Sequence, residues 1–359
     1  MRIALYKDNL STCRGADHLI VSQAAAFAEL GHNVTLLACP TGQPLSFAVA
    51  QTVALRLMPR EQVRETVARE GFDVCIAAGS NEILDLTCDG RCDPPVKTVT
   101  ELLIAPSGLF KWKRFLRNAR IKRAFNRSHA VTVLCDVYRE AVRRFAPAPR
   151  IETIPDWPDI REPSPEELAG AKRRKTILYP AAVNRLKNQL LLVKAFARLA
   201  EEFPDWEVHL YGDSRKAYGA TCAETARRLG VAERVRFLPF TDNLPAAYAS
   251  ASIMAYPSLL EGLPLALLEG ARFGLPAVVV EELPAARNMV ADGKTGLVVR
   301  NNPKDYADAL RKLMADAPLR EALGRQARER SLAVYAKAPI MAQWEALLRS
   351  LAEERPGSR

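Results

Sequence analysis

The stretch from Tyr256 to Val280, YPSLLEGLPLALLEGARFGLPAVVV, decides how the chain folds. Its apolar ends are typical of buried strands, and the glycines and prolines between them mark turns. Pro264 is suited to open a helix, since proline is favoured in the first turn. The stretch therefore predicts a strand, a loop, a helix closed by Gly274 and a second strand.

Two carboxylates lie in this stretch, Glu261 in the loop and Glu269 in the second turn of the predicted helix. The open amides and positive dipole end at the helix start suit a phosphate. A carboxylate on the otherwise apolar helix is costly unless it is paired or binds hydroxyls. Two carboxylates flanking an anion-binding helix start suit a phosphate between two sugars, as in a nucleotide sugar.

The alternation of strand and helix runs through the whole chain. The chain begins with a predicted βαβ unit, whose strands are Arg2–Tyr6 and Asn33–Cys39. Its predicted helix runs from Asp17 to Leu30, with Asp17 as the N-cap. The alternation restarts after residues 155–175, which are rich in proline and charge. We therefore expect two Rossmann-like α/β domains, with the ligand in the cleft between them.

We expect domain boundaries at residues 1–155 for an acceptor domain and 156–335 for a donor domain. Residues 336–359 contain an amphipathic helix that we expect to return to the first domain, although packing on the second is the simpler alternative. Four large apolar side chains share one face of this helix, namely Trp344, Leu347, Leu348 and Leu351.

Composition narrows the class of protein. Hydrophobic residues make up 48% and charged residues 26%, as in globular proteins, and the net charge of +10 predicts an anionic partner. The seven cysteines are scattered, so we expect reduced thiols and no zinc site. Without a signal pattern or a long apolar run, we expect a cytoplasmic protein, soluble or peripheral on the inner membrane.

Residues 108–127 carry eight basic side chains and no acidic one. Combined with aromatic residues on a helix, this pattern favours contact with anionic lipid headgroups. A solvated basic helix is the alternative, and no nucleic-acid recognition module is evident.

The spacing of Glu261 and Glu269, E-x7-E, within this phrase resembles the donor site of the retaining GT-B glycosyltransferases of family 4. Asp292–Val299, Ile154–Trp157 and Gly15–Asp17 resemble further segments of that family. The resemblance covers nearly the whole chain and implies the GT-B fold. It implies that Glu269 binds the donor ribose and that Glu261, with Gly262, Leu263 and Pro264, lies at the transferred sugar and the phosphate.

The resemblance also implies that Lys187 neutralises the donor diphosphate. A fixed cation there would stabilise the charge that develops on the leaving group. Gly15 would admit the phosphate closely, and Gly212 would line the donor site. The family usually has an arginine where this chain has Ala182, and Arg185 is the candidate replacement.

Two further departures concern the reaction. The family histidine is absent from Thr98–Leu102, where Glu101 is the candidate substitute, and residues 285–288 lack the usual Pro-Glu. The resemblance implies a metal-independent enzyme without a cofactor that moves a hexosyl or N-acetylhexosaminyl group. The donor would be a UDP- or GDP-sugar, and the acceptor a glycan or lipid-linked sugar in cell-surface polysaccharide or glycolipid synthesis. A nucleotide-sugar 2-epimerase of the same fold and an inactive binding module are the alternatives.

Overall fold

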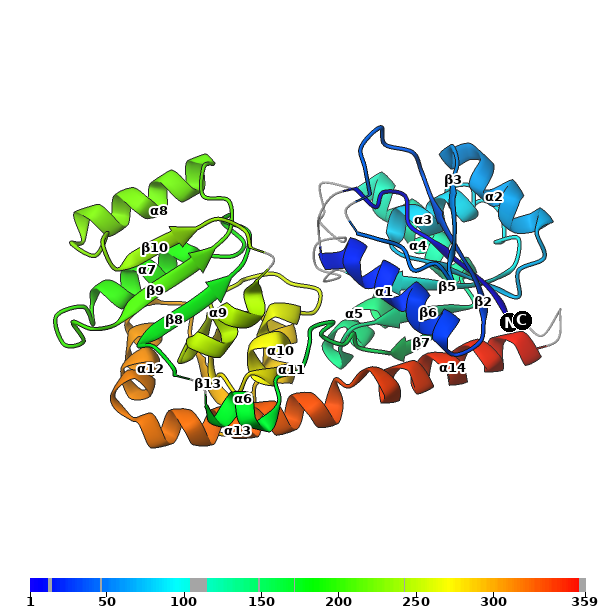
Figure 1. The fold of residues 1–359 in the computed structure, drawn as a ribbon. Coiled ribbons are helices and arrows are strands. Elements are labelled where there is room, and N and C mark those ends of the chain that lie inside the picture. Colours follow the sequence, from blue (N-terminus) through cyan, green and yellow to red (C-terminus); the bar gives the residue numbers. More distant parts are fainter. Residues whose placement is uncertain are drawn as a thin grey trace. The chain divides into compact units, whose positions relative to one another are not determined.

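The structure is a computed structural model whose chain divides into two compact units (Figure 1). Unit 1 contains Met1–Asp159 and Lys337–Arg359, and unit 2 contains Ile160–Ala336. The sequence predicts its first boundary four residues earlier. The structure describes residues 1–11, 15–45, 47–103, 115–147, 149–170, 172–241 and 243–354.

Unit 1 is built on a seven-stranded parallel sheet in the order β3-β2-β1-β4-β5-β6-β7. Its strands are β1 (Arg2–Tyr6), β2 (Asn33–Ala38), β3 (Ala54–Leu57), β4 (Val74–Ala77), β5 (Lys97–Leu102), β6 (Ala130–Val133) and β7 (Arg150–Thr153). Its helices are α1 (Gly15–Glu29), α2 (Arg60–Arg69), α3 (Ser80–Leu86), α4 (Phe115–Arg127), α5 (Asp136–Phe145) and α14 (Lys337–Glu353).

The helix α14 packs on one face of the unit 1 sheet together with α1. Its four predicted apolar side chains are at most 2% exposed and join a core with alternate strand residues such as Ile3 and Val99. The ring of Trp344 meets Phe27 of α1 edge-on, with the ring centroids 6.0 Å apart. The predicted return of the C-terminal helix to the first domain is therefore confirmed.

Two helix ends differ from the sequence-based expectation. The helix α1 begins at Gly15, so Asp17 lies buried in its first turn and is not the N-cap. The helix α7 ends at Ala197, whereas the sequence suggests a helix that continues to Phe203. The amides of Arg198 and Leu199 bond three residues back, which tightens the chain into a turn before Pro204.

Unit 2 has a six-stranded parallel sheet in the order β10-β9-β8-β11-β12-β13. Its strands are β8 (Thr176–Pro180), β9 (Glu207–Tyr211), β10 (Val235–Leu238), β11 (Ile253–Tyr256), β12 (Ala277–Val280) and β13 (Gly296–Val299). Its helices are α6 (Pro165–Ala169), α7 (Gln189–Ala197), α8 (Ala217–Arg228), α9 (Leu244–Ser250), α10 (Leu265–Arg272), α11 (Pro284–Met289), α12 (Pro303–Ala315) and α13 (Ala317–Val334).

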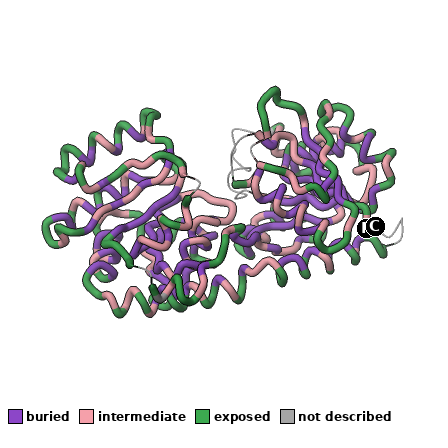
Figure 2. Tube along the Cα trace, in the orientation of Figure 1, coloured by how far each residue is buried: buried purple, intermediate pink, exposed green. Residues whose placement is uncertain are grey.

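Both sheets are buried at their centres, as sheets covered by helices on two faces must be (Figure 2). The strands β4, β11 and β12 are buried at every residue, which explains why their sequences are continuous apolar runs. Two parallel sheets with crossover helices confirm the predicted pair of Rossmann-like domains. Among the described residues, no helix combines the length and the apolar character needed to span a membrane.

Candidate functional site

The predicted donor segment follows β11 and leads into α10. The helix begins at Leu265, one residue later than the sequence suggests, and Pro264 occupies its N-cap position. The carbonyl of Pro264 accepts the amide of Leu267, and the carbonyl of Leu263 accepts the amide of Leu265. A side chain at Gly270 would contact Met254 of β11, so the helix lies close to the sheet.

Glu261 pairs with Lys187, although the two residues are far apart in the sequence. The Nζ atom of Lys187 lies 2.5 Å from Oε1 of Glu261, and their side chains are 22% and 10% exposed. The two segments are also joined by the amide of Leu259, which donates to the carbonyl of Leu186 at 2.8 Å. The structure thus brings together two residues that the sequence assigns to one site.

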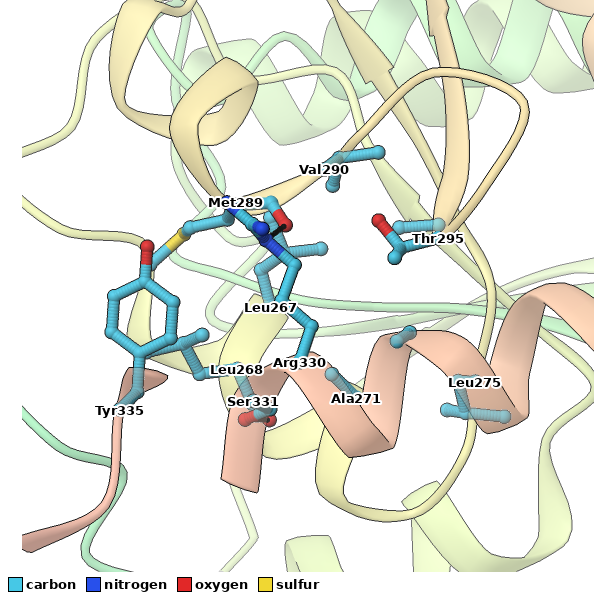
Figure 3. A pocket seen from close by; sticks show the side chains of 12 residues that line it. Leu267, Leu268, Ala271, Leu275, Met289, Val290, Thr295, Arg330, Ser331 and Tyr335 are labelled. Carbon is cyan, nitrogen blue, oxygen red and sulfur yellow. Dashed lines mark hydrogen bonds between the residues drawn. The ribbon is translucent and has the colours of Figure 1, made fainter. Parts of the chain in front are cut away.

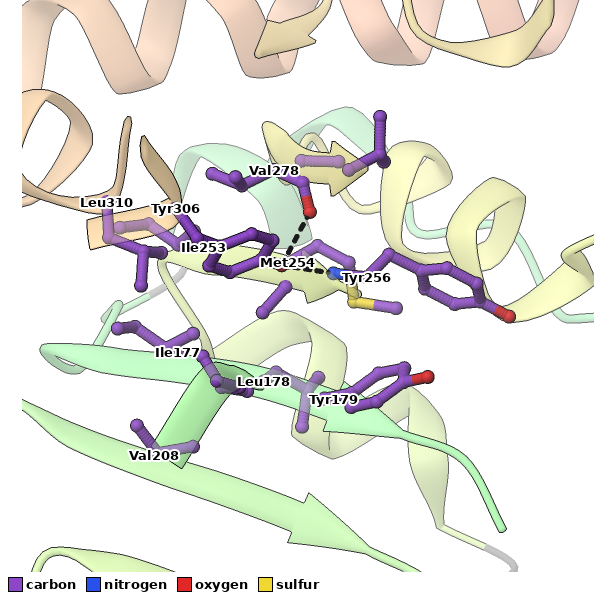
Figure 4. Close-up of a cluster of buried hydrophobic side chains, with 14 of the residues drawn as sticks. Ile177, Leu178, Tyr179, Val208, Ile253, Met254, Tyr256, Val278, Tyr306 and Leu310 are labelled. Atoms are coloured by element: carbon purple, nitrogen blue, oxygen red, sulfur yellow. Dashed lines mark hydrogen bonds between the residues drawn. The ribbon is translucent and has the colours of Figure 1, made fainter. Parts of the chain in front are cut away.

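Buried tyrosines contact this pair, and Figure 4 shows three of them, Tyr179, Tyr256 and Tyr306, within the core of unit 2. The hydroxyl of Tyr256 donates to Oε1 of Glu261 at 3.2 Å, and that of Tyr179 donates to the carbonyl of Lys187 at 2.9 Å. The two rings meet edge-on at 5.2 Å, and the hydroxyl of Tyr306 accepts the Tyr256 amide at 2.9 Å. Burial raises the pKa of Tyr256 well above its usual range, so its phenol stays a donor.

Glu269 accepts a hydrogen bond from a different helix. The hydroxyl of Tyr248, in α9, donates to Oε2 of Glu269 at 2.6 Å. One turn further along α10, the buried guanidinium of Arg272 donates to the Ser331 hydroxyl and the Tyr335 carbonyl, each at 2.9 Å. These contacts fix the helix that carries Glu269.

The segment before Lys187 contains Ala182, where the family usually has an arginine, and Arg185, the candidate replacement. The carbonyl of Ala182 accepts from the buried Gln189 side chain at 3.0 Å. The guanidinium of Arg185 lies 5.9 Å from the centre of the Tyr218 ring, a cation–π distance. In this structure Arg185 therefore contacts α8.

Gly212 lies where β9 ends, and only glycine fits there. Its φ of +154° is rare for other residues, and a Cβ atom would overlap the carbonyl oxygen of Ala181. The backbones that follow β8 and β9 consequently approach each other closely.

Gly15 and Glu101 belong to unit 1. Gly15 is the first residue of α1, and a Cβ atom there would meet none of the other described residues within 4 Å. Glu101 lies within β5, is 2% exposed and accepts from Nε2 of Gln23 at 3.1 Å. Burial raises its pKa to about 8. Burial, followed by the nearby Glu101, raises the pKa of Asp156 as well.

The surroundings of Glu101 are short of hydrogen-bond donors. Among the described residues, no partner is placed to bond Oε2 of Glu101, Oε1 of Gln23 or Oγ1 of Thr132, and all three side chains are buried. Thr132 is the register partner of Glu101 on β6, so both side chains point to the same face of the sheet. Burial with few donors therefore favours the protonated form of the Glu101 carboxyl.

A cavity of about 20 Å³ lies between α10 and α13 and is lined by side chains that include Leu268, Met289 and Tyr335 (Figure 3). By helical geometry Leu267, Leu268 and Ala271 face it from the side of α10 opposite Glu269. It is therefore separate from the predicted donor site. In the described part of the chain, no three His, Cys, Asp or Glu side chains are grouped to hold a metal ion.

Two family models match the chain side by side. The model for glycosyl transferases group 1 matches residues 160–330, and that for a glycosyl transferase 4-like domain matches residues 14–157. Sucrose-phosphate synthase from Thermosynechococcus elongatus has the same fold, with a TM-score of 0.81 and 19% identity over 98% of each chain. The chain belongs to the GT-B glycosyltransferases.

Other members of this group show how far the likeness extends. Anabaena HepE in complex with UDP and glucose superimposes with a TM-score of 0.79 at 17% identity, covering 98% of this chain and 100% of that one. The D-inositol 3-phosphate glycosyltransferase of Corynebacterium jeikeium is 34% identical over 198 residues, 52% of this chain and 46% of the relative. The chain spans about half or less of the length of the curated relatives it matches.

Within this GT-B glycosyltransferase, sequence reasoning missed the residues that support the two glutamates. Tyr256 was recognised only as a strand end, and Tyr248 was not singled out. The available signal was a tyrosine in an otherwise small-residue helix, Leu244–Ser250, where a large polar-tipped side chain needs a partner when buried.

Proposed function

We propose that the protein transfers a hexosyl or N-acetylhexosaminyl group from a UDP- or GDP-sugar to a glycan or lipid-linked acceptor, with retention of anomeric configuration. The acceptor would bind unit 1 and the donor unit 2. The product would enter cell-surface polysaccharide or glycolipid. The similar Anabaena HepE structure is a complex with UDP and glucose, which supports a nucleotide-sugar donor.

The observation that carries the proposal is the ion pair of Lys187 and Glu261 beside the start of α10. In the proposed reaction Lys187 stabilises the negative charge that develops on the leaving diphosphate. Glu261, together with the amides of Gly262 and Leu263, contacts the transferred sugar and the phosphate. Glu269 accepts hydrogen bonds from the hydroxyls of the donor ribose. Three further residues lie around the donor phosphates, namely Gly15, Gly212 and Arg185.

The role of Glu101 remains a prediction. The sequence places it where the family carries a histidine, and the structure gives it a raised pKa. A protonated carboxyl is a hydrogen-bond donor, as a histidine is. No metal or cofactor is part of the proposed reaction.

The first test is binding of nucleoside diphosphates and nucleotide sugars, followed by thermal shift. The wild type should be stabilised by one base family, and Glu269→Ala should lose most of that shift. Glu224→Ala, which changes an exposed glutamate of the same unit, is the matched control and should keep the shift. The absence of any shift in the wild type would refute the donor site.

The second test identifies the reaction by NMR with the sugar nucleotide that binds. Transfer to an acceptor from a glycolipid extract with an unchanged anomeric configuration supports the proposal. Inversion of configuration would refute retention. A changed sugar formed without an acceptor would show the 2-epimerase, and binding without turnover would show the inactive module.

The exposed side of α4 is our proposed contact with anionic membrane. The helix carries five basic residues and no acidic one, of which Arg120 and Arg127 pair with Asp89 and Asp93. Ile121 and Phe125 are buried against the unit, whereas Leu116 is 79% exposed. Residues 108–114, which carry the other predicted basic side chains, lie outside the described residues.

Co-sedimentation with vesicles tests this contact. Vesicles that contain anionic lipid should retain the wild type, and purely zwitterionic vesicles should not. Charge reversal at the exposed Lys122 and Arg123 should weaken retention severalfold, and the same reversal at the exposed Arg227 and Arg228 of unit 2 should not. Equal loss in both variants would show a nonspecific effect of net charge.

A further inference from the structure

Tyr248 is a fully buried phenol that connects two crossover helices of unit 2. It lies in α9, is 0% exposed, and its hydroxyl donates to Oε2 of Glu269 in α10 at 2.6 Å. A buried phenol needs a partner, and a charged acceptor makes a hydrogen bond about twice as strong as a neutral one. The contact is therefore a strong constraint on the Glu269 side chain.

The ring of Tyr248 is itself fixed by α10. It stacks on Phe273, which directly follows the last residue of α10, with ring centroids 5.6 Å apart and an interplanar angle of 29°. The same tyrosine thus contacts the second turn of α10 through its hydroxyl and the end of that helix through its ring. Burial and the Glu269 charge raise the pKa of Tyr248 well above its usual range, so the hydroxyl remains a donor.

This geometry restricts the orientation of a carboxylate. A glutamate side chain has several rotamers, and ordering it during ligand binding reduces the affinity that its contacts provide. A donor fixed by packing removes this cost in advance. The planar carboxylate then presents its acceptor positions in one direction, which suits the two adjacent hydroxyls of a ribose.

We infer that Tyr248 is a positioning residue that holds the Glu269 carboxylate in the orientation that accepts the hydroxyls of the donor ribose. The inference rests on the proposed function, because it assigns the ribose to Glu269. It makes Tyr248 a determinant of the preference for ribonucleotides over nucleotides that lack the ribose hydroxyls. It does not place Tyr248 in contact with the ligand.

The experiment compares a nucleoside diphosphate that binds the wild type with its 2′,3′-dideoxy form by isothermal titration calorimetry. The variant is Tyr248→Phe, which keeps the ring and removes the hydroxyl. We expect it to bind the ribonucleotide about tenfold more weakly, the size of one hydrogen bond to a charged group. Its affinity for the dideoxy form should be unchanged, so the ribose preference falls by the same factor.

Tyr6→Phe is the matched control. The hydroxyl of Tyr6 donates to Oδ2 of Asp85 at 2.7 Å, which is the same bond type at a similarly buried site in unit 1. This variant loses a buried phenol–carboxylate contact and should keep both nucleotide affinities. A ribose preference that falls equally in both variants would overturn the inference.

The outcomes separate the inference from the proposed function. If Glu269→Ala keeps the wild-type ribose preference, the assignment of ribose to Glu269 fails. If Glu269→Ala loses the preference and Tyr248→Phe keeps it, only the positioning role fails. Equal weakening of both nucleotides by Tyr248→Phe would show a merely structural role and would also overturn the inference.

A second variant covers the case in which Tyr248→Phe melts below the assay temperature. Phe273→Leu removes the stacked ring and leaves the hydroxyl in place. It should lower the ribose preference by less than tenfold while the affinity for the dideoxy form stays constant. An unchanged ribose preference in this variant would contradict the view that the stacked Tyr248 ring fixes the Glu269 carboxylate.

Discussion

Replacing Glu101 with glutamine removes a proton-binding group from the interior of unit 1 and keeps an acceptor oxygen for Gln23. Burial raises the pKa of Glu101 from its ordinary 4.5 to about 8. Between these two values the folded protein keeps a proton that the unfolded chain has lost. The free energy of unfolding therefore falls as the pH rises through this window and is constant above it.

The structure sets the size of the effect. Each pH unit within the window costs about 1.4 kcal/mol of stability, so the change from pH 5.5 to pH 7.5 costs about 2–3 kcal/mol. Asp156 contributes with the same sign, because burial and the Glu101 charge raise its pKa as well. The Glu101→Gln variant should lose the part of the pH dependence that Glu101 contributes, keep the part that burial of Asp156 contributes, and be the more stable protein at pH 7.5.

Urea unfolding at the two pH values, followed by tryptophan fluorescence, measures the effect. Trp157 and Trp344 are both buried in unit 1 and report its unfolding. Glu61→Gln is the matched control, since Glu61 is an exposed glutamate of the same unit, and its curves should follow the wild type. If Glu101→Gln and the wild type lose equal stability between the two pH values, Glu101 is not the buried acid described here.

Three further substitutions, with Arg311→Ala as the control for the first, test the packing of the two units by thermal or urea unfolding. Arg272→Ala should lower the free energy of unfolding by about 2–5 kcal/mol, because it removes a buried charged donor. Arg311→Ala breaks two exposed ion pairs and should lower it by less than about 1 kcal/mol. Similar losses of stability in the two variants would contradict this reasoning. Gly212→Ala should lower the free energy of unfolding by about 1–3 kcal/mol through backbone strain and overlap with Ala181, and it should weaken nucleotide binding. A variant as stable as the wild type would contradict the backbone conformation described for Gly212. Trp344→Ala should cost about 3–5 kcal/mol of unit 1 stability, and a small effect would show that α14 adds little to that core.

The sequence predicts those parts of the fold whose residues carry strong periodic or turn signals. The buried strands β11 and β12 of unit 2 are continuous apolar runs, and the start of α12 at Pro303 carries a clear capping signal. The side chain of Asn302 caps that helix by accepting two of its first amides, and Pro303 follows directly. The strand β3 was missed because three of its four residues are exposed, which leaves no apolar pattern.

The candidate site was predictable only in part, because its supporting contacts join segments that are distant in the chain. Lys187 and Glu261 were assigned together through a family resemblance, and the structure places them in contact. The bond from Tyr248 to Glu269 has no spacing that a sequence would reveal, since it depends on how α9 and α10 pack. The burial of Glu101 was equally hidden, because a glutamate in a strand is normally taken to face solvent.

Glu261 and Glu269 of unit 2 differ from Glu101 of unit 1 in the donors around them. In unit 2, Glu261 accepts from a lysine and a phenol, and Glu269 accepts from a second phenol. In unit 1, Glu101 accepts from the Gln23 amide at 3.1 Å, and its Oε2 atom has no hydrogen-bond partner among the described residues. Donors stabilise a carboxylate, whereas burial without enough of them favours the protonated acid. The same residue type therefore accepts from a lysine or a phenol in unit 2 and has a raised pKa in the interior of unit 1, a difference that packing creates and that glutamate itself does not.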